Sequence, residues 1–192
     1  MVGPSGGEEM IARDVQNEAG STTTGTGVAG ETQRGTGGGS VQVVEFLLGR
    51  EYFAIDLFDV REVVEYTHIT HLPSAPEYIR GIIDLRGEIT TIIDLKTTLH
   101  IADQGERDEK EKRIIVLDPQ ITGKKIGIMV DDVRSVSTFS RDQVDDAATV
   151  NGGNTHIIGI IKKKQAVRGR DETELIIWID IRQILKEILA GR

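Results

Sequence analysis

The sequence predicts a mainly β fold in which two similar small barrels pack side by side. Three observations lead to this prediction. From Val41 onward, short runs of β-branched and aromatic residues alternate with turn residues, as expected for many short strands. Several of these runs recur in the same order later in the chain, which indicates an internal repeat. One well-marked helical spacing of apolar residues lies near the C-terminus.

The internal repeat pairs segments of similar sequence in the two halves of the chain. Phe53–Val63 matches Ile126–Val136, Ile79–Ile83 matches Ile157–Ile161, and Thr91–Leu95 matches Ile177–Ile181. This alignment makes Val60 equivalent to Val133, and Asp59 equivalent to Asp132. Each copy is too small to hold a good core alone, so the repeat favours two β-barrels that share their packing.

Most of the expected elements are strands. They are predicted at Val41–Leu48, Tyr52–Leu57, Ile79–Leu85, Ile89–Leu95, Arg113–Asp118, Lys125–Val130 and Leu175–Ile179. Phe58–Val64 has mixed apolar spacing and is predicted to form a helical turn. Asp94 is placed to cap a short helix. Asp180–Gly191 is the well-marked helix, with a capping-box-like pair of Asp180 and Gln183 at its start.

The rest of the chain is organised around the predicted hairpin of Ile79–Leu85 and Ile89–Leu95. The Arg86-Gly87 pair between the two runs is a turn in which glycine supplies a positive φ. Isoleucine occurs on both faces of both runs, which favours an interior hairpin over an edge. The arginine has no role in forming the turn, so it is a candidate functional residue.

Composition excludes several classes of function. The 192 residues contain no cysteine, which excludes disulfides, a thiol nucleophile and cysteine-based metal sites. The net charge of −8 argues against sequence-independent binding to nucleic acid or anionic lipid. No apolar run approaches the roughly 20 residues of a membrane span, and the polar N-terminus lacks the apolar core of a signal peptide. These features are those of a cytoplasmic protein.

Residues 1–40 are predicted to be a flexible tail, since Gly, Ser and Thr dominate from Gly20 to Ser40. Residues 41–192 are then the folded domain. Within the tail, Gly25–Gly30 matches the G-x-G-x-x-G dinucleotide fingerprint. The strand before it and the helix after it that such a site requires are both missing, so the match is predicted to be a coincidence of composition. A nucleotide-dependent enzyme that uses this segment stays as an alternative.

Two other candidate sites have simpler explanations. His68 and His71 form an H-x-x-H pair, but no third ligand has a diagnostic spacing, so no metal site is predicted. The basic residues of Lys162–Arg170 could contact phosphate, which keeps a small-barrel nucleic-acid-binding module as the main alternative function. A solvated hairpin is favoured, because the cluster lacks interleaved aromatic residues. No arrangement typical of a catalytic or cofactor site stands out.

The chain resembles the CheW-like chemotaxis coupling proteins from about Val41 to Leu189. The residues that carry the resemblance are Tyr52–Leu57, Val60-x-Glu62, Ile69-Thr70-x-Leu72-Pro73, Gly81-x-x-x-Leu85-Arg86-Gly87, Ile92–Leu95, Gly127–Val133 and Leu175–Ile184. Two positions depart from the pattern: Asp84 stands where asparagine is usual, and Thr91 where proline is common. The resemblance implies two intertwined five-stranded SH3-like barrels with short helices and a C-terminal helix.

The resemblance also implies a function without catalysis. Members of the family bridge methyl-accepting chemoreceptors and the regulatory domain of the chemotaxis histidine kinase, at receptor arrays on the inner face of the membrane. The implied receptor-binding groove comprises Val44, Leu57, Val60 and Val133. Glu62 and Arg86 are implied to form an ion pair that orients the hairpin. No catalytic residue, cofactor, metal, nucleic acid or membrane insertion is expected.

Overall fold

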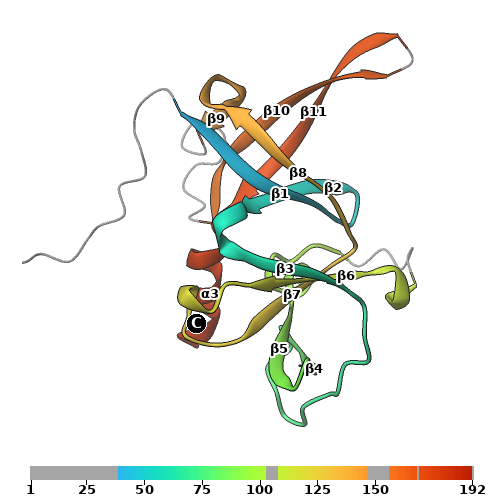
Figure 1. The fold of residues 1–192 in the computed structure, drawn as a ribbon, viewed down its shortest axis with the longest axis vertical. Helices are drawn as coiled ribbons and strands as arrows, with labels where there is room; N and C mark the ends of the chain where they lie inside the picture. The colour runs from blue at the N-terminus through green and yellow to red at the C-terminus, as the bar shows by residue number, and fades with distance from the viewer. Residues whose placement is uncertain (1–38, 103–107, 147–155, 168, 192) are drawn as a thin grey trace, which may run out of the picture. The chain divides into compact units, whose positions relative to one another are not determined.

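The computed structural model of the protein describes residues 39–102, 108–146, 156–167 and 169–191. Two curled sheets contain more than half of these residues (Figure 1). Barrel A is a sheet with the strand order β8-β1-β2-β11-β10-β9. Its strands are β1 (Ser40–Leu48), β2 (Glu51–Asp56), β8 (Asp132–Ser140), β9 (Val144–Asp146), β10 (Ile157–Val167) and β11 (Arg170–Ile179).

Barrel B is a sheet with the strand order β3-β6-β7-β5-β4. Its strands are β3 (Val60–Glu65), β4 (Ile79–Leu85), β5 (Glu88–Asp94), β6 (Arg113–Leu117) and β7 (Ile126–Val130). The mainly β fold is therefore as predicted. Barrel A has one strand more than barrel B, because the short β9 adds to the outer edge of β10.

Short helical elements lie between the strands of the described residues, and one helix follows the last strand. They are the helices α1 (Leu95–Thr98) and α3 (Ile181–Leu189), and the 3-10 turns η1 (Leu57–Asp59), η2 (Glu109–Glu111), η3 (Pro119–Ile121) and η4 (Arg141–Gln143). The predicted caps are present: Asp94 accepts from the amides of Lys96 and Thr97, and Asp180 accepts from the amide of Gln183. The Gln183 side chain donates to Glu187. The apolar stripe of α3 is buried up to Ile188.

The repeat seen in the sequence maps the strand order of one sheet onto that of the other. Exchanging β1, β2, β3, β4 and β5 with β6, β7, β8, β10 and β11, respectively, converts the order of barrel B into the order β8-β1-β2-β11-β10 of barrel A. The register agrees as well, because Phe53 pairs with Ile177 in barrel A and the equivalent Ile126 pairs with Thr91 in barrel B. Each barrel combines strands from both halves of the chain, so the two barrels are intertwined.

Apolar residues fill three regions of the fold. The largest cluster lies between the two sheets and α3, and it includes Phe46, Ile55, Ile115, Ile128 and Ile184. A second cluster fills barrel A around Ile161 and Trp178, and a third fills barrel B around Ile83, Ile92 and Met129. The core between the barrels draws on both halves of the chain, so neither half retains it alone.

The structure corrects three expectations for single elements. The predicted helical turn at Phe58–Val64 is limited to η1, and the residues from Val60 onward form the strand β3. The hairpin of β4 and β5 is not interior, because β4 is the outermost strand of barrel B and only Thr70 bridges to it. The basic cluster was expected between two strands of a hairpin, but Lys162–Lys164 lie within the strand β10 and Arg170 lies within β11.

Other expectations fall outside the described residues. They concern the tail up to residue 38, with its Gly25–Gly30 segment, and Arg168 of the basic cluster. The boundary at residue 40, and the division of the folded part into two subdomains, therefore stay predictions. No helix in the described part of the chain is long and apolar enough to cross a membrane.

Candidate functional site

A row of valines on β3 and another on β8 face the core between the two barrels. On β3, Val60 lies opposite Leu117 and Val63 lies opposite Ile115. Residues directly opposite on paired strands point to the same side of a sheet. Because Leu117 and Ile115 belong to the core between the barrels, Val60 and Val63 are on that side of barrel B.

The strand β8 repeats this arrangement in barrel A. Val133 lies opposite Phe46 and Val136 lies opposite Val44, and both partners belong to the core between the barrels. A register shift next to Phe46 keeps the two valines on one side although they are three residues apart. The two rows thus occupy equivalent positions of the repeat.

We call Leu57, Val60, Val63, Val133 and Val136 the inter-barrel face. Leu57, Val60 and Val133 are half-buried and pack against the core between the barrels. Val63 is 41% exposed and Val136 is 59% exposed, so each row ends in an apolar side chain in water. Phe58, in the turn before Val60, is 75% exposed. Large apolar side chains that gather on a surface are typical of a binding site.

One residue of the expected groove lies elsewhere. Val44 is only 1% exposed, because it is on a strand that β8 and β2 cover on both sides and it points into the core between the barrels. It supports the inter-barrel face from beneath and does not line a surface. Leu57, Val60 and Val133 are half-buried, and the receptor-binding groove itself stays a prediction.

The expected contact between Arg86 and Glu62 is present. The Arg86 Nη2 atom donates to the Glu62 Oε2 atom at 2.9 Å. Arg86 lies at the turn between β4 and β5, and Glu62 lies on β3, so the pair joins the first and last strands of barrel B. The Arg86 side chain is 77% exposed, and an ion pair so open to water contributes little to stability.

The turn itself explains why Asp84 is tolerated where asparagine is usual. Arg86 and Gly87 both have positive φ angles, 55° and 83°, as the two central residues of a tight hairpin turn. The Asp84 Oδ1 atom accepts from the Gly87 amide at 2.6 Å. An asparagine side chain would accept in the same way, so the aspartate preserves the turn.

A small pocket opens beside this ion pair at the end of barrel B. It is lined by apolar residues such as Leu85 and Val116 and by charged residues such as Glu88 and Lys125. The hydrogen bond and positive charge of Lys125 lower the pKa of Glu88. Two pairs of opposite charge therefore line the pocket, Lys125 with Glu88 and Arg86 with Glu62.

Two further ion pairs attach the helices to the opposite half of the chain. Lys96 of α1 binds Asp131 at 2.7 Å, and Arg182 of α3 binds Asp59 at 2.6 Å. Both carboxylates are buried. Burial raises the pKa of Asp59, although the hydrogen bond and charge of Arg182 oppose this shift. The buried partner in the second half is Asp131, and not the Asp132 that the repeat aligns with Asp59.

These carboxylates flank the inter-barrel face. Asp59 directly precedes Val60, and Asp131 lies two residues before Val133. Asp131 also accepts from the Gly49 amide at 2.6 Å. The positions of the two valine rows are thus fixed by buried contacts from α1, α3 and the β1–β2 turn.

The other candidate residues do not form a site. His68 and His71 are exposed, and the described residues include no group of three or more metal-ligating side chains. Lys162 forms an ion pair with Asp145, and Lys163 forms one with Glu45. The basic cluster therefore presents less free positive charge than the sequence suggests.

Sequence reasoning did not propose Val63, Val136 and Phe58 as candidate site residues, although all three are exposed apolar side chains. The repeat alignment already paired Val63 with Val136, and this pairing was the available signal. A valine at equivalent positions of two strands fits a core as well as a surface, so exposure was needed to distinguish the two.

The exchanged strands, the shared core and the inter-barrel face define a paired SH3-like barrel protein. Comparison with known families agrees, since the profile of the CheW-like domain matches residues 42–189. The chain belongs to this family of chemotaxis coupling proteins, whose members are non-enzymatic scaffolds.

Individual relatives are similar over most of their length. The chemotaxis protein CheW of Treponema pallidum is 31% identical over 74% of this chain and 81% of the relative. The protein of the same name from Thermotoga maritima is 28% identical over 77% of this chain and 89% of the relative. A crystal structure described as the scaffolding protein TtCheW from Thermoanaerobacter tengcongensis aligns with a TM-score of 0.62 and 33% identity, over 76% and 92% of the two chains.

Proposed function

We propose that this protein is a chemotaxis coupling scaffold that bridges the cytoplasmic tip of methyl-accepting chemoreceptors and the chemotaxis histidine kinase. The observation that carries the proposal is the inter-barrel face. Its two valine rows come from equivalent positions of the repeat and end in the exposed side chains of Val63 and Val136. Family membership supports the choice of partners.

The receptor tip is a helical hairpin, and the proposed contact is a helix lying on the inter-barrel face. Helix-in-groove recognition uses apolar side chains at intervals along one helix face. The half-buried Leu57, Val60 and Val133 would form the floor, and Val63 and Val136 would form the sides. Phe58 lies next to this floor and is available to a second helix.

The kinase would bind elsewhere, barrel to barrel, through its own regulatory domain. The protein would act without chemistry of its own, at the cytoplasmic side of the membrane and through protein contacts alone. Signal transmission would then depend on geometry: a shift of the receptor helix changes how the scaffold holds the kinase.

Val136→Glu tests the receptor contact with little risk to folding. The side chain is 59% exposed, so the free protein keeps the new charge in water. Receptor binding would bury this charge without a partner, which costs several kcal/mol. We expect receptor affinity to fall at least about 100-fold, with kinase affinity unchanged, when each is measured separately by titration calorimetry.

Ile89→Glu is the matched control, because Ile89 is 61% exposed but lies on β5, outside the inter-barrel face. This variant should bind the receptor as the unaltered protein does. Equal receptor affinity of the Val136→Glu and Ile89→Glu proteins would exclude the inter-barrel face as the receptor site.

A further inference from the structure

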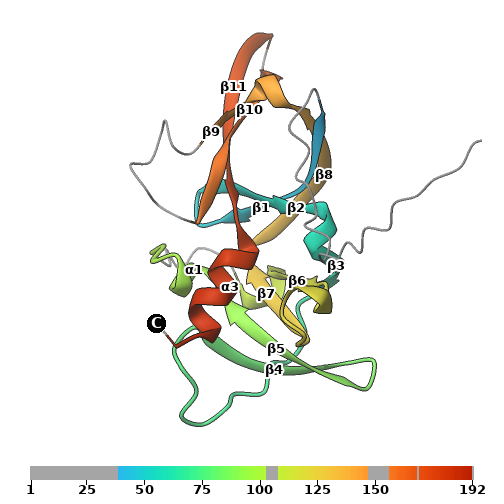
Figure 2. The same cartoon turned by 90° about the vertical axis from the view of Figure 1, so that its left-hand side faces the viewer.

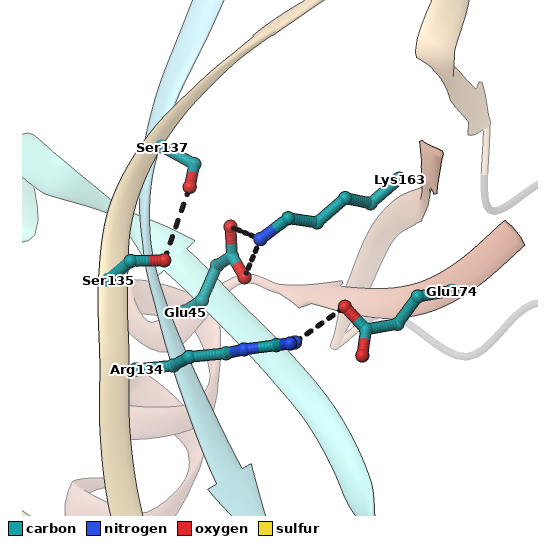
Figure 3. Close-up of polar contacts among 6 residues, drawn as sticks. All are labelled: Glu45, Arg134, Ser135, Ser137, Lys163 and Glu174. Carbon is teal, nitrogen blue, oxygen red and sulfur yellow. Dashed lines mark hydrogen bonds and ion pairs between the residues drawn. The ribbon is translucent and has the colours of Figure 1, made fainter. Parts of the chain in front are cut away.

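Two ion pairs cross the interior of barrel A. Lys163 on β10 donates to both carboxylate oxygens of Glu45 on β1, at 2.8 and 2.7 Å, and Arg134 on β8 binds Glu174 on β11 at 2.5 Å. β1 and β10 are not neighbours in the sheet, and neither are β8 and β11. Figure 3 shows the four side chains reaching toward one another from opposite walls. We call them the charge latch.

Glu45 is the unusual member of the charge latch. Its carboxylate is 0% exposed, and the interior of barrel A around it also holds an apolar cluster, where a charged side chain is not expected. Its other surroundings are polar: Ser135 lies opposite it on β8 and hydrogen bonds to Ser137. Lys163 and Arg134 are partly exposed, so the charge latch lies where barrel A opens to water.

Barrel B has apolar residues at the positions of Glu45 and Lys163, although Arg61 and Glu88 repeat the charges of Arg134 and Glu174. Glu45 pairs with Ala54, and Val116 pairs with Gly127, which is the residue that the repeat aligns with Ala54, so Val116 is the equivalent of Glu45. In the same way, Lys163 pairs with Glu174 and Leu85 pairs with the aligned Glu88, so Leu85 is the equivalent of Lys163. Val116 and Leu85 pack together with the apolar cluster of barrel B. The same position in one fold is thus held by an apolar pair in one barrel and by a charged pair in the other.

The charge latch adds to few other contacts of the outer part of the β10–β11 hairpin, one of which is the exposed ion pair of Lys162 with Asp145 on β9. β10 pairs with β9 only at Gly159–Ile161, and β11 pairs with β2 only at Ile176–Trp178. Beyond these contacts, residues 162–167 and 170–175 pair only with each other among the described strands, and they project past the rest of barrel A (Figure 1). Isolated two-stranded hairpins are marginal in water.

Separating the hairpin from the facing strands has a different free energy in barrel A and in barrel B. Separating β4 and β5 from β6 in barrel B would expose Leu85 and Val116 to water, which is unfavourable. Separating the β10–β11 hairpin from β1 and β8 would hydrate Glu45 and Lys163. The recovered hydration offsets much of the lost attraction, since desolvation of a buried pair often exceeds its Coulomb energy.

We propose that the charge latch makes barrel A the compliant half of the protein, in which the β10–β11 hairpin alternates between a state latched to β1 and β8 and an unlatched state. In the orientation of Figure 2 this hairpin and β8 face each other across the barrel. Because β8 carries Val133 and Val136 on its other side, the two states differ directly behind the inter-barrel face.

Distance measurement between spin labels tests the two states, and the chain contains no cysteine that would interfere. Thr138→Cys on β8 and Thr173→Cys on β11 place labels on exposed positions across barrel A. Glu65→Cys and Ile89→Cys place a control pair across barrel B at exposed positions of β3 and β5. We expect two distance populations for the barrel A pair, and a single narrow one for the control pair.

The decisive variant is Glu45→Val/Lys163→Leu, which gives barrel A the apolar pair of barrel B. It should reduce the barrel A distances to one narrow population. In the unaltered pair, raising salt from about 0.05 M to about 0.5 M should increase the long-distance population, because dissolved ions stabilise the hydrated, separated charges of the unlatched state more than they screen the buried pair; in the variant it should not. A single narrow, salt-independent population in the protein with its native charge latch would refute the proposal.

A second measurement connects the charge latch to signalling, and it rests on the proposed function. With receptor and kinase reconstituted, Glu45→Val/Lys163→Leu should retain both affinities but reduce receptor-dependent control of the kinase at least about threefold. Unchanged control would refute the role in signalling. If the unaltered protein itself fails to bind the two partners, the proposed function fails, while the distance measurement still tests the charge latch.

Discussion

At the scale of single residues, the feature that organises the molecule is a set of buried carboxylates, each paired with a cation from a distant part of the chain. Glu45, Asp59 and Asp131 are all buried. Their partners are Lys163, Arg182 and Lys96. Removing one member of a buried pair leaves an uncompensated charge, so these residues are expected to be far more sensitive to substitution than the many charges on the surface.

Lys96→Met should therefore destabilise the protein strongly. Lys96 is 12% exposed and Asp131 is 4% exposed, so the substitution would leave the Asp131 carboxylate buried without its cation. We expect the free energy of unfolding to fall by about 3–5 kcal/mol in urea denaturation. Lys125→Met is the control, because it also removes a cation but from the exposed Glu88. A loss no greater than that of the control would mean that the Asp131 pair contributes little.

Asp59 gives a pH dependence with a defined sign. Its pKa is raised above its ordinary value of 3.8, chiefly by burial, so the folded protein holds this proton more tightly than the unfolded chain does. The stability from this group is complete below pH 3.8 and is lost as the pH rises through the raised pKa. In Asp59→Asn this loss should disappear, so that the variant gains stability relative to the unaltered protein as the pH increases.

Urea denaturation at a series of pH values from acid to neutral measures this difference. Arg182→Met is the informative companion, because it removes the hydrogen bond and charge that lower the Asp59 pKa. In that variant the stability contributed by the protonated Asp59 should persist to higher pH before it is lost. Parallel stability profiles of the Asp59→Asn and unaltered proteins would contradict the assignment.

At the scale of elements, the β4–β5 hairpin combines a locally determined shape with a long-range contact. Asp84, Arg86 and Gly87 determine the turn, whereas Glu62 on β3 determines where the arginine points. Since the ion pair is exposed, its contribution is to orientation more than to stability.

Arg86→Ala should accordingly lower the free energy of unfolding by at most about 1 kcal/mol. Coupling of receptor to kinase should fall much more, because the hairpin is no longer oriented against β3. Arg86→Lys retains the charge but cannot form the same planar contact, and it should recover only part of the coupling. The comparison of denaturation with a reconstituted kinase assay checks this expectation, which fails if coupling is lost only in proportion to stability.

The sequence predicted the elements whose formation is local. β1, β2, β4, β5 and α3 follow from alternation, turn residues and caps within a few residues of each other. The strand β3 was not predicted, because Leu57–Asp59 does form a helical turn and the change to a strand at Val60 depends on pairing with β6. The extent of β10 was also missed, since Lys163 is stabilised by Glu45, which is 118 positions away in the chain.

The same difference between local and long-range information decided which features of the candidate site could be predicted. Equivalence of Val60 and Val133 followed from the repeat, which is a property of the sequence. The burial of Val44 and the exposure of Val136 depend on which strands cover which faces, and this is decided by the order of strands in the sheet. A residue type alone carries no such information, because valine is equally suited to both places.

At the scale of the whole molecule, the two halves of the chain are one folding unit because each barrel needs strands from both. Barrel A requires β1 and β2 together with β8, β10 and β11, and barrel B requires β3, β4 and β5 together with β6 and β7. The core between the barrels is likewise composed of residues from both halves.

Fragments that divide the chain between the halves should therefore fold only together. We expect residues 1–102 and residues 103–192, prepared separately, to show no cooperative unfolding transition. Mixed in equal amounts, they should restore the far-ultraviolet spectrum and the transition of the intact protein, at a lower midpoint because association is no longer intramolecular. Cooperative unfolding of either fragment alone would show that one barrel suffices.

The parallel pairing of β2 with β11 has a consequence for how the protein is made. A ribosome completes β2 about 120 residues before it completes β11, which at roughly 5–20 residues per second is a delay on the order of 10 s. Throughout this interval one edge of β2 has no partner, whereas β5 waits only about 36 residues for β7. Barrel B can thus close on the nascent chain first, and barrel A closes only after β11 has been made.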